Sequence, residues 1–177
     1  MSACGGSDLD AAVGTGRAAG AVRPIEMTFR TTTGEWVHLG DLRGKPVLLF
    51  LMATFDGVSQ AALRPVSRFV RHRGEELHVL GVAVQPNPHE LLAAYVNALE
   101  PPFPFVYEAN QTIGEGTSPL GDLPGIPMFV MIDAHGQISG QHQGFPNTDT
   151  LPILLDDAID RGGIRETPGP TPLIGQD

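Results

Sequence analysis

The feature that most constrains this chain is an uninterrupted apolar run at residues 47–52, preceded by the chain-breaking residues 44–46 (Gly-Lys-Pro). A strand needs such a run when both of its faces are covered, whereas a strand with one wet face alternates apolar and polar residues. The run is far shorter than the roughly 20 residues of a membrane-spanning helix. It therefore predicts a central strand of an α/β sheet and no transmembrane segment.

The pattern on either side of this strand alternates between strands and helices. A helix is expected over residues 59–73, where apolar residues recur at helical spacing, arginines occupy the other face and Gly74 follows. The other expected elements are a hairpin over 27–31 and 36–39, a strand over 77–84, a helix over 89–99, a strand over 103–107, a hairpin over 128–132 and 137–142, and a helix over 148–161. Right-handed crossovers make the first units parallel, and the last hairpin adds antiparallel strands. We predict an α/β fold with a central mixed β-sheet, flanking helices and an N-terminal β-hairpin.

The 177 residues divide into a body and two ends of different composition. Residues 1–24 are mostly Gly, Ala, Ser and Asp, and residues 164–177 are rich in proline. Such segments bury too little apolar surface to offset the entropy lost on ordering. We expect a disordered tether over 1–24, one domain over 25–163 and a disordered tail over 164–177.

Charge and cysteine content exclude several classes of protein. Twenty acidic against eleven basic residues give a net charge of −9, which excludes a nucleic-acid partner because phosphate binding needs a basic surface. The single cysteine, Cys4, excludes an intrachain disulfide, a dithiol pair and a Cys-rich zinc site. No cofactor is implied.

Cys4 follows the small residues Ser2 and Ala3, as at the end of a bacterial lipoprotein signal, where the cysteine becomes lipidated. The charged and apolar regions of such a signal do not stand before it. Two interpretations stay open. Cys4 is a lipid anchor of a cell-envelope protein, periplasmic or lipid-anchored, or it is a chance cysteine in the tail of a cytoplasmic protein.

Three stretches of the body carry motifs of one family. Residues 37–50 lead into the apolar run, residues 125–138 fit the pattern G-x-P-x-x-x-x-I-D-x-x-G-x-I, and Gly144 stands shortly before the last helix. Over residues 25–160 the chain resembles the thioredoxin-like superfamily, in particular the TlpA/redoxin branch that includes AhpC/TSA-like proteins. The resemblance implies a thioredoxin-like fold in which Pro127 is a cis-proline and Ile126 offers its backbone to an extended peptide. Alternatively, Pro127 only opens a strand.

The chain departs from this family at the place of its W-C-x-x-C motif, where it has residues 55–59, Phe-Asp-Gly-Val-Ser. Asp56 takes the place of the nucleophilic cysteine and Ser59 that of the resolving cysteine. Thiol–disulfide exchange needs a thiolate and a second thiol, which a carboxylate and a hydroxyl cannot replace. No catalytic residue is therefore predicted, and Asp56 and Ser59 are degenerate active-site positions.

Three interpretations of these positions remain. Asp56 and Ser59 cap the N-terminus of the helix, where free N–H groups need acceptors. Alternatively, a groove between residues 55–57 (Phe55, Asp56, Gly57) and residues 126–127 (Ile126, Pro127) binds a peptide or small ligand. The third is acid–base chemistry by Asp56, for which no partner base is visible.

These observations predict a non-catalytic binding or accessory module with a protein or peptide partner. A thiol–disulfide oxidoreductase or antioxidant-type protein that uses partner thiols or Cys4 is the alternative. A copper carrier of the Sco type is the third, although both cysteines are missing and His135 and His142 lack ligand spacing. Met128 and Met131 face opposite sides of a strand, which favours core packing over a metal site. The arginine row 64, 68 and 71 predicts a solvated helix face; the alternative is contact with an acidic partner.

Overall fold

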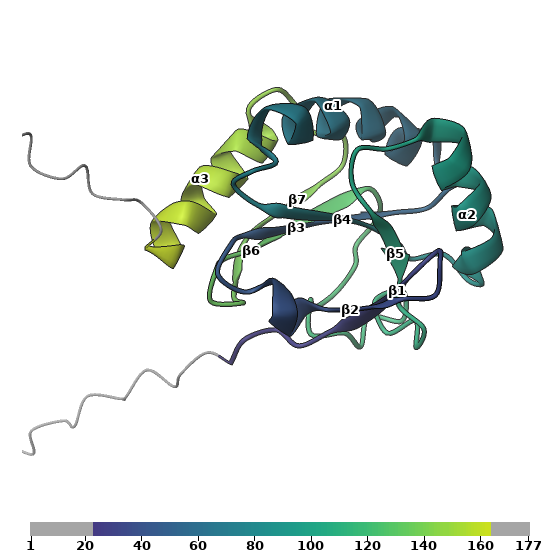
Figure 1. The fold of residues 1–177 in the computed structure, drawn as a ribbon, viewed down its shortest axis with the longest axis horizontal. Coiled ribbons are helices and arrows are strands. Elements are labelled where there is room, and N and C mark those ends of the chain that lie inside the picture. The colour runs from purple at the N-terminus through teal and green to yellow at the C-terminus, as the bar shows by residue number, and fades with distance from the viewer. Residues whose placement is uncertain (1–22, 164–177) are drawn as a thin grey trace, which may run out of the picture.

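The computed structural model describes residues 23–163, so the expectations for residues 1–22 and 164–177, Cys4 included, lie outside the described residues. Seven strands form one mixed sheet (Figure 1). They are β1 (Thr28–Thr31), β2 (Trp36–His38), β3 (Val47–Met52), β4 (His78–Ala83), β5 (Phe105–Tyr107), β6 (Met128–Ile132) and β7 (Ile138–Gln143). The order across the sheet is β2-β1-β5-β4-β3-β6-β7.

The apolar run forms β3, which is buried along its whole length. It pairs in parallel with β4 and antiparallel with β6. β4 in turn pairs in parallel with β5, and the N-terminal hairpin joins β5 through β1, antiparallel. The predicted mixed sheet is confirmed, with both parallel crossovers between the start of β3 and the end of β5.

The helices are α1 (Gly57–Arg73), α2 (Pro88–Leu99) and α3 (Thr150–Gly162), with a short 3-10 helix, η1 (Leu39–Leu42). Figure 1 shows α1 along the top of the molecule, α3 at the left and α2 at the right. Their apolar residues share one core with the even-numbered residues of β3, which are Leu48, Phe50 and Met52. Because strand side chains alternate, the odd-numbered residues of β3 face a second core. Residues of η1 and of the connection over 108–127 cover that core.

α1 begins two residues earlier than predicted, because Asp56 caps it there. It ends at Gly74 as predicted, but Gly74 has a right-handed φ of −62°. Its backbone N–H donates to the Val70 carbonyl, so the end of α1 does not depend on a left-handed glycine. Arg73 in the last turn pairs with Glu76 and, at 3.0 Å, with Asp156 of α3, which ties the two helices together at this end.

Two further predictions concern a glycine in the last hairpin and membrane-spanning segments. The β6–β7 turn places Gly136 at φ +85°, the left-handed position predicted for it. Over residues 23–163, no helix combines the length and hydropathy that crossing a membrane requires.

Candidate functional site

The candidate site lies at one edge of the sheet, where β3 ends and β6 begins. Antiparallel pairing sets Leu51 opposite Met128, so the residues after β3 and those before β6 lie at the same edge. Asp56 comes four residues after β3, and the Ile126–Pro127 peptide bond, which is cis, comes directly before β6. The topology thus brings the two halves of the predicted groove to one edge.

Asp56 is the N-cap of α1. Its backbone is extended, with φ −84° and ψ 118°, and its Oδ2 accepts a hydrogen bond of 2.7 Å from the Ser59 backbone N–H. The first N–H groups of a helix have no intrahelical acceptor, and the helix dipole favours a negative charge beside them. The predicted capping role of Asp56 is confirmed.

Ser59 does not cap the helix through its side chain, which corrects that part of the prediction. The residue is fully buried, and its hydroxyl has no hydrogen-bond partner among residues 23–163. Burying an unpaired hydroxyl costs about 1–3 kcal/mol. A cysteine thiol is a weak donor that behaves as a small apolar group, so it is easier to bury than this hydroxyl.

A polar network that the sequence did not reveal holds the loop after β3. The Gln85 side chain is buried, and its Oε1 accepts hydrogen bonds from the Thr54 N–H at 2.6 Å and the Thr54 hydroxyl at 2.9 Å. The Gln60 amide donates to the Thr54 carbonyl at 2.7 Å. This network fixes the chain just before Phe55 and Asp56. The one available signal was a glutamine directly after a predicted buried strand.

Large apolar side chains are exposed around this edge. The exposed fraction is 71% for Phe55, 46% for Val58 and 53% for Phe145. Phe145 belongs here because the neighbouring Gly144, at φ +93°, donates its N–H to the Pro127 carbonyl at 2.8 Å. Gathered apolar side chains on a surface are typical of binding sites.

The backbone beside Pro127 offers unused hydrogen-bonding groups. Within residues 23–163, the N–H and the carbonyl of Ile126 make no hydrogen bond, and Ile126 is only half-buried. Exposed backbone of this kind can pair with an extended peptide, as an edge strand does. The edge therefore combines free backbone, apolar side chains and one carboxylate.

The residues considered as metal ligands do not form a cluster within residues 23–163. In the described part of the chain, no three His, Cys, Asp or Glu residues cluster so as to hold a metal ion. Met128 and Met131 are buried in opposite cores, as their spacing predicts. The His142 ring approaches the Phe145 carbonyl at 3.4 Å, and His135 is exposed on the β6–β7 turn.

No protein-family model and no curated protein matches the chain, but solved structures do. The exposed lipoprotein thioredoxin Etrx1 of Streptococcus pneumoniae is 19% identical with a TM-score of 0.62, over 75% of this chain and 98% of that one. StoA of Bacillus subtilis is 15% identical with a TM-score of 0.60, over 74% and 96%. A thiol:disulfide interchange protein of Chlorobium tepidum is 18% identical with a TM-score of 0.64, over 77% and 95%. This protein therefore has the thioredoxin-like fold that its sequence predicts.

Proposed function

We propose that this protein is a peptide-binding module of the TlpA/redoxin type that has lost the cysteine pair and performs no thiol chemistry at its former active site. The proposed groove consists of Phe55, Asp56 and Gly57 on one side and of Ile126 and Pro127 on the other. The observation that carries the proposal is the unpaired backbone of Ile126 beside exposed apolar side chains.

The chemistry at positions 56 and 59 argues against redox catalysis. In disulfide exchange a thiolate attacks a sulfur, a mixed disulfide forms, and a second thiol displaces the first. Asp56 and Ser59 present a carboxylate and a hydroxyl, which form no stable bond to sulfur. Cys4 is the one cysteine of the chain and lies outside the described residues.

An extended peptide can bind through the backbone groups and the apolar side chains that this edge presents. The N–H and carbonyl of Ile126 pair with the peptide backbone, which gives affinity without regard to sequence. Phe55, Val58 and Phe145 contact its apolar side chains. The Asp56 carboxylate already accepts a hydrogen bond from the first turn of α1, so the peptide does not need an anionic group at the N-terminus of this helix.

The test uses carbamidomethylated insulin B chain, an extended peptide with aromatic residues and no reactive thiol. Isotope-labelled protein is titrated and followed by NMR, and we expect shifts at Phe55, Gly57 and Ile126. Phe55→Ser should weaken binding about fivefold or more, because an exposed aromatic anchor is lost. Trp36→Ser, which removes an exposed aromatic on strand β2, should leave binding unchanged.

A parallel assay separates the proposal from the redox alternative. Wild-type protein should not accelerate the reduction of insulin by dithiothreitol. Turnover above background that Cys4→Ser abolishes would establish an oxidoreductase instead. Absence of any shift at the edge would overturn the peptide-binding proposal.

We also propose a cell-envelope location with Cys4 as a lipidated residue. The small residues before Cys4 support it, as does the description of the structural neighbour Etrx1 as an exposed lipoprotein. Metabolic labelling with an alkyne fatty acid in a bacterial host, using the natural gene with its upstream sequence, should mark the wild-type protein. The Cys4→Ser variant should stay unlabelled, and equal labelling of both would refute the assignment.

A further inference from the structure

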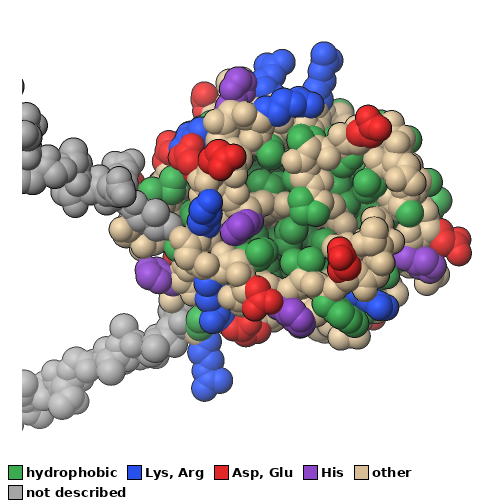
Figure 2. All heavy atoms as spheres, viewed as in Figure 1, with side chains coloured by type: hydrophobic (Ala, Val, Ile, Leu, Met, Phe, Trp, Pro, Cys, Tyr) green, Lys and Arg blue, Asp and Glu red, His purple; other side chains and the backbone are tan. Residues whose placement is uncertain are grey.

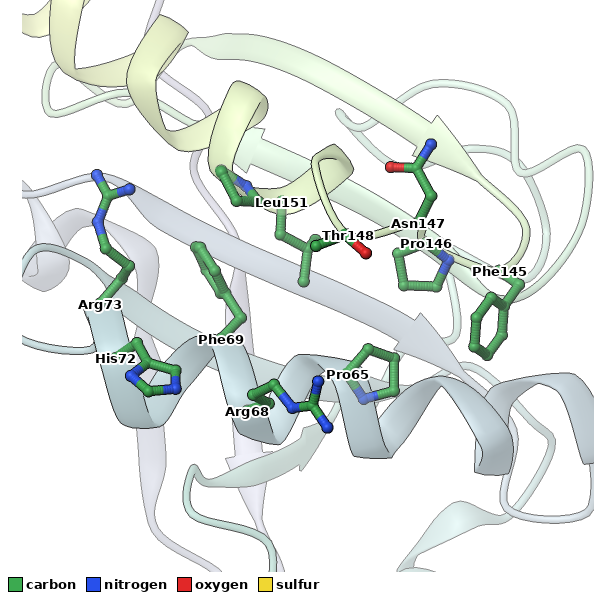
Figure 3. Close-up of a pocket in the computed structure, with 11 residues that line it drawn as sticks. Pro65, Arg68, Phe69, His72, Arg73, Phe145, Pro146, Asn147, Thr148 and Leu151 are labelled. Carbon is green, nitrogen blue, oxygen red and sulfur yellow. The ribbon is translucent and has the colours of Figure 1, made fainter.

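We infer that a groove between α1 and α3 is a docking site for an acidic peptide segment of a partner protein that carries a large apolar side chain. The groove has a volume of about 480 Å³. Figure 3 shows Pro65 and Phe69 on α1 facing Leu151 and the segment that leads into α3, with the Arg68 side chain lying along α1. The groove adjoins the proposed edge at Ile126, because Phe145 lines the groove as well, but its apolar floor and its cations belong to α1 and α3 and are not part of that edge.

An ion pair joins the two helices at one end of the groove. Arg73 of α1 bonds to Asp156 of α3 at 3.0 Å, at the C-terminal end of α1. Toward the N-terminal end of α3 the helices leave a gap with an apolar floor, formed by Phe69 and Leu151, which are buried, and by the half-buried Pro65. Its volume is within the range of ligand sites, and a concave floor accepts a side chain rather than a flat surface.

The ionisable residues that line the groove are basic. They are Arg68, His72 and Arg73, and among residues 23–163 no carboxylate lines it, although Glu76 and Asp156 pair with Arg73 beside it. The whole of α1 contains four arginines and no acidic residue, in a chain of net charge −9. Figure 2 shows blue side chains gathered at the top of the molecule, where Figure 1 places α1.

One of these cations is available to a partner. Arg73 is engaged by Glu76 and Asp156, whereas Arg68 is exposed and has no hydrogen bond or ion pair within residues 23–163. The polar lining residues Asn147 and Thr148 do not add an anion. A cationic rim attracts acidic partners and raises their rate of association. Together with the apolar floor, it selects a segment with carboxylates on either side of one large apolar residue.

The test titrates isotope-labelled protein with the capped peptide Asp-Asp-Phe-Leu-Asp-Asp. We expect NMR shifts at Arg68, Thr148 and Leu151, and none there with Lys-Lys-Phe-Leu-Lys-Lys or Asp-Asp-Ser-Ser-Asp-Asp. Arg68→Glu should weaken binding about fivefold or more, because it reverses a charge on the rim. The matched control is Arg71→Glu, an equal reversal three residues further along α1 and outside the groove, which should change affinity much less.

Three results would overturn the inference. The first is absence of binding at these residues, and the second is equal weakening by both variants, which would indicate unspecific attraction. The third is binding to phosphatidylglycerol vesicles, lost in Arg68→Glu, without binding of the acidic peptide, which would indicate a membrane surface. If insulin B chain causes no shifts at Phe55 and Ile126, the proposed peptide-binding function is wrong, and the inference about the groove between α1 and α3 is not affected.

Discussion

Asp56 and Ser59 are three residues apart in sequence and differ in how their oxygens are satisfied. The Asp56 carboxylate accepts the Ser59 N–H at 2.7 Å and remains half-buried. The Ser59 hydroxyl is buried and, in the part of the chain that the structure describes, has no hydrogen-bond partner. The Asp56 carboxylate stabilises the start of α1, whereas burial of the Ser59 hydroxyl lowers the stability of the folded protein.

Asp56→Ala should lower the free energy of unfolding by about 0.5–2 kcal/mol, because the N-cap acceptor is lost. Asp56→Asn keeps an acceptor at this position and should cost about 1 kcal/mol or less. Urea unfolding of the three proteins measures both values. Equal loss in the two variants would mean that the charge, and not the hydrogen bond, stabilises the helix.

Ser59→Ala should be at least as stable as wild type, since alanine is the better helix former and no hydrogen bond is lost. The control is Ser139→Ala. Ser139 is also buried, but its hydroxyl donates to the Met131 carbonyl at 3.2 Å, so that variant should lose about 1 kcal/mol. If Ser59→Ala loses as much in urea unfolding, the Ser59 hydroxyl has a partner after all.

Among the secondary-structure elements, β4 and β5 pack closely at one point, where Gly81 of β4 lies against the ring of Phe105 of β5. A Cβ at Gly81 would lie 2.5 Å from the Phe105 ring. That ring is held by stacking on Phe103, with centroids 5.3 Å apart. The two strands therefore require a residue without a side chain at this position.

Gly81→Ala should destabilise the protein by about 1–3 kcal/mol, the usual cost of overpacking a core. Gly57→Ala is the matched control, because a Cβ there meets nothing within 4 Å. That control should be neutral or slightly stabilising. Thermal unfolding followed by circular dichroism compares them, and equal melting temperatures would contradict the packing described here.

His78 begins β4 and makes stability depend on pH. Burial, and secondly the charge of Lys45, lower the pKa of His78 from its ordinary value of 6.5. The unfolded chain therefore binds a proton more readily than the native one, and stability falls as the pH drops below 6.5 toward the native pKa.

His78→Gln should show a smaller loss of stability over that pH range than wild type. His135→Gln, which removes an exposed histidine from the β6–β7 turn, serves as the control. Urea midpoints at neutral pH and at a pH below 6.5 provide the comparison. If stability depends on pH in His78→Gln as it does in wild type, the lowered pKa of His78 is contradicted.

The elements were predictable where a local pattern determines them. The apolar run of β3 and the helical spacing of α1 correspond to observed elements, because burial and periodicity are local properties of the sequence. The long-range features were not predictable in this way. Gln85 contacts Thr54 across 31 positions, and the groove between Phe69 and Leu151 depends on the packing of two distant helices.

For the whole molecule, one sheet separates two cores and places the end of β3 beside the start of β6. This topology is enough to bring residues 55–59 and 126–127 to one edge. It does not determine which chemistry the edge performs. Under the proposed function, that chemistry depends on the side chains at positions 56 and 59, which are a carboxylate and a hydroxyl.

We propose that Asp56 and Ser59 occupy the positions of a lost cysteine pair. The most direct measurement uses the triple variant Cys4→Ser, Asp56→Cys, Ser59→Cys, oxidised in air, alkylated and weighed by mass spectrometry. Residues three apart on a helix are within the Cα separation of about 4.4–6.8 Å that a disulfide spans. We predict that no free thiol is alkylated until a reductant is added, and that the variant accelerates insulin reduction. Alkylation of both thiols without reductant would contradict the account.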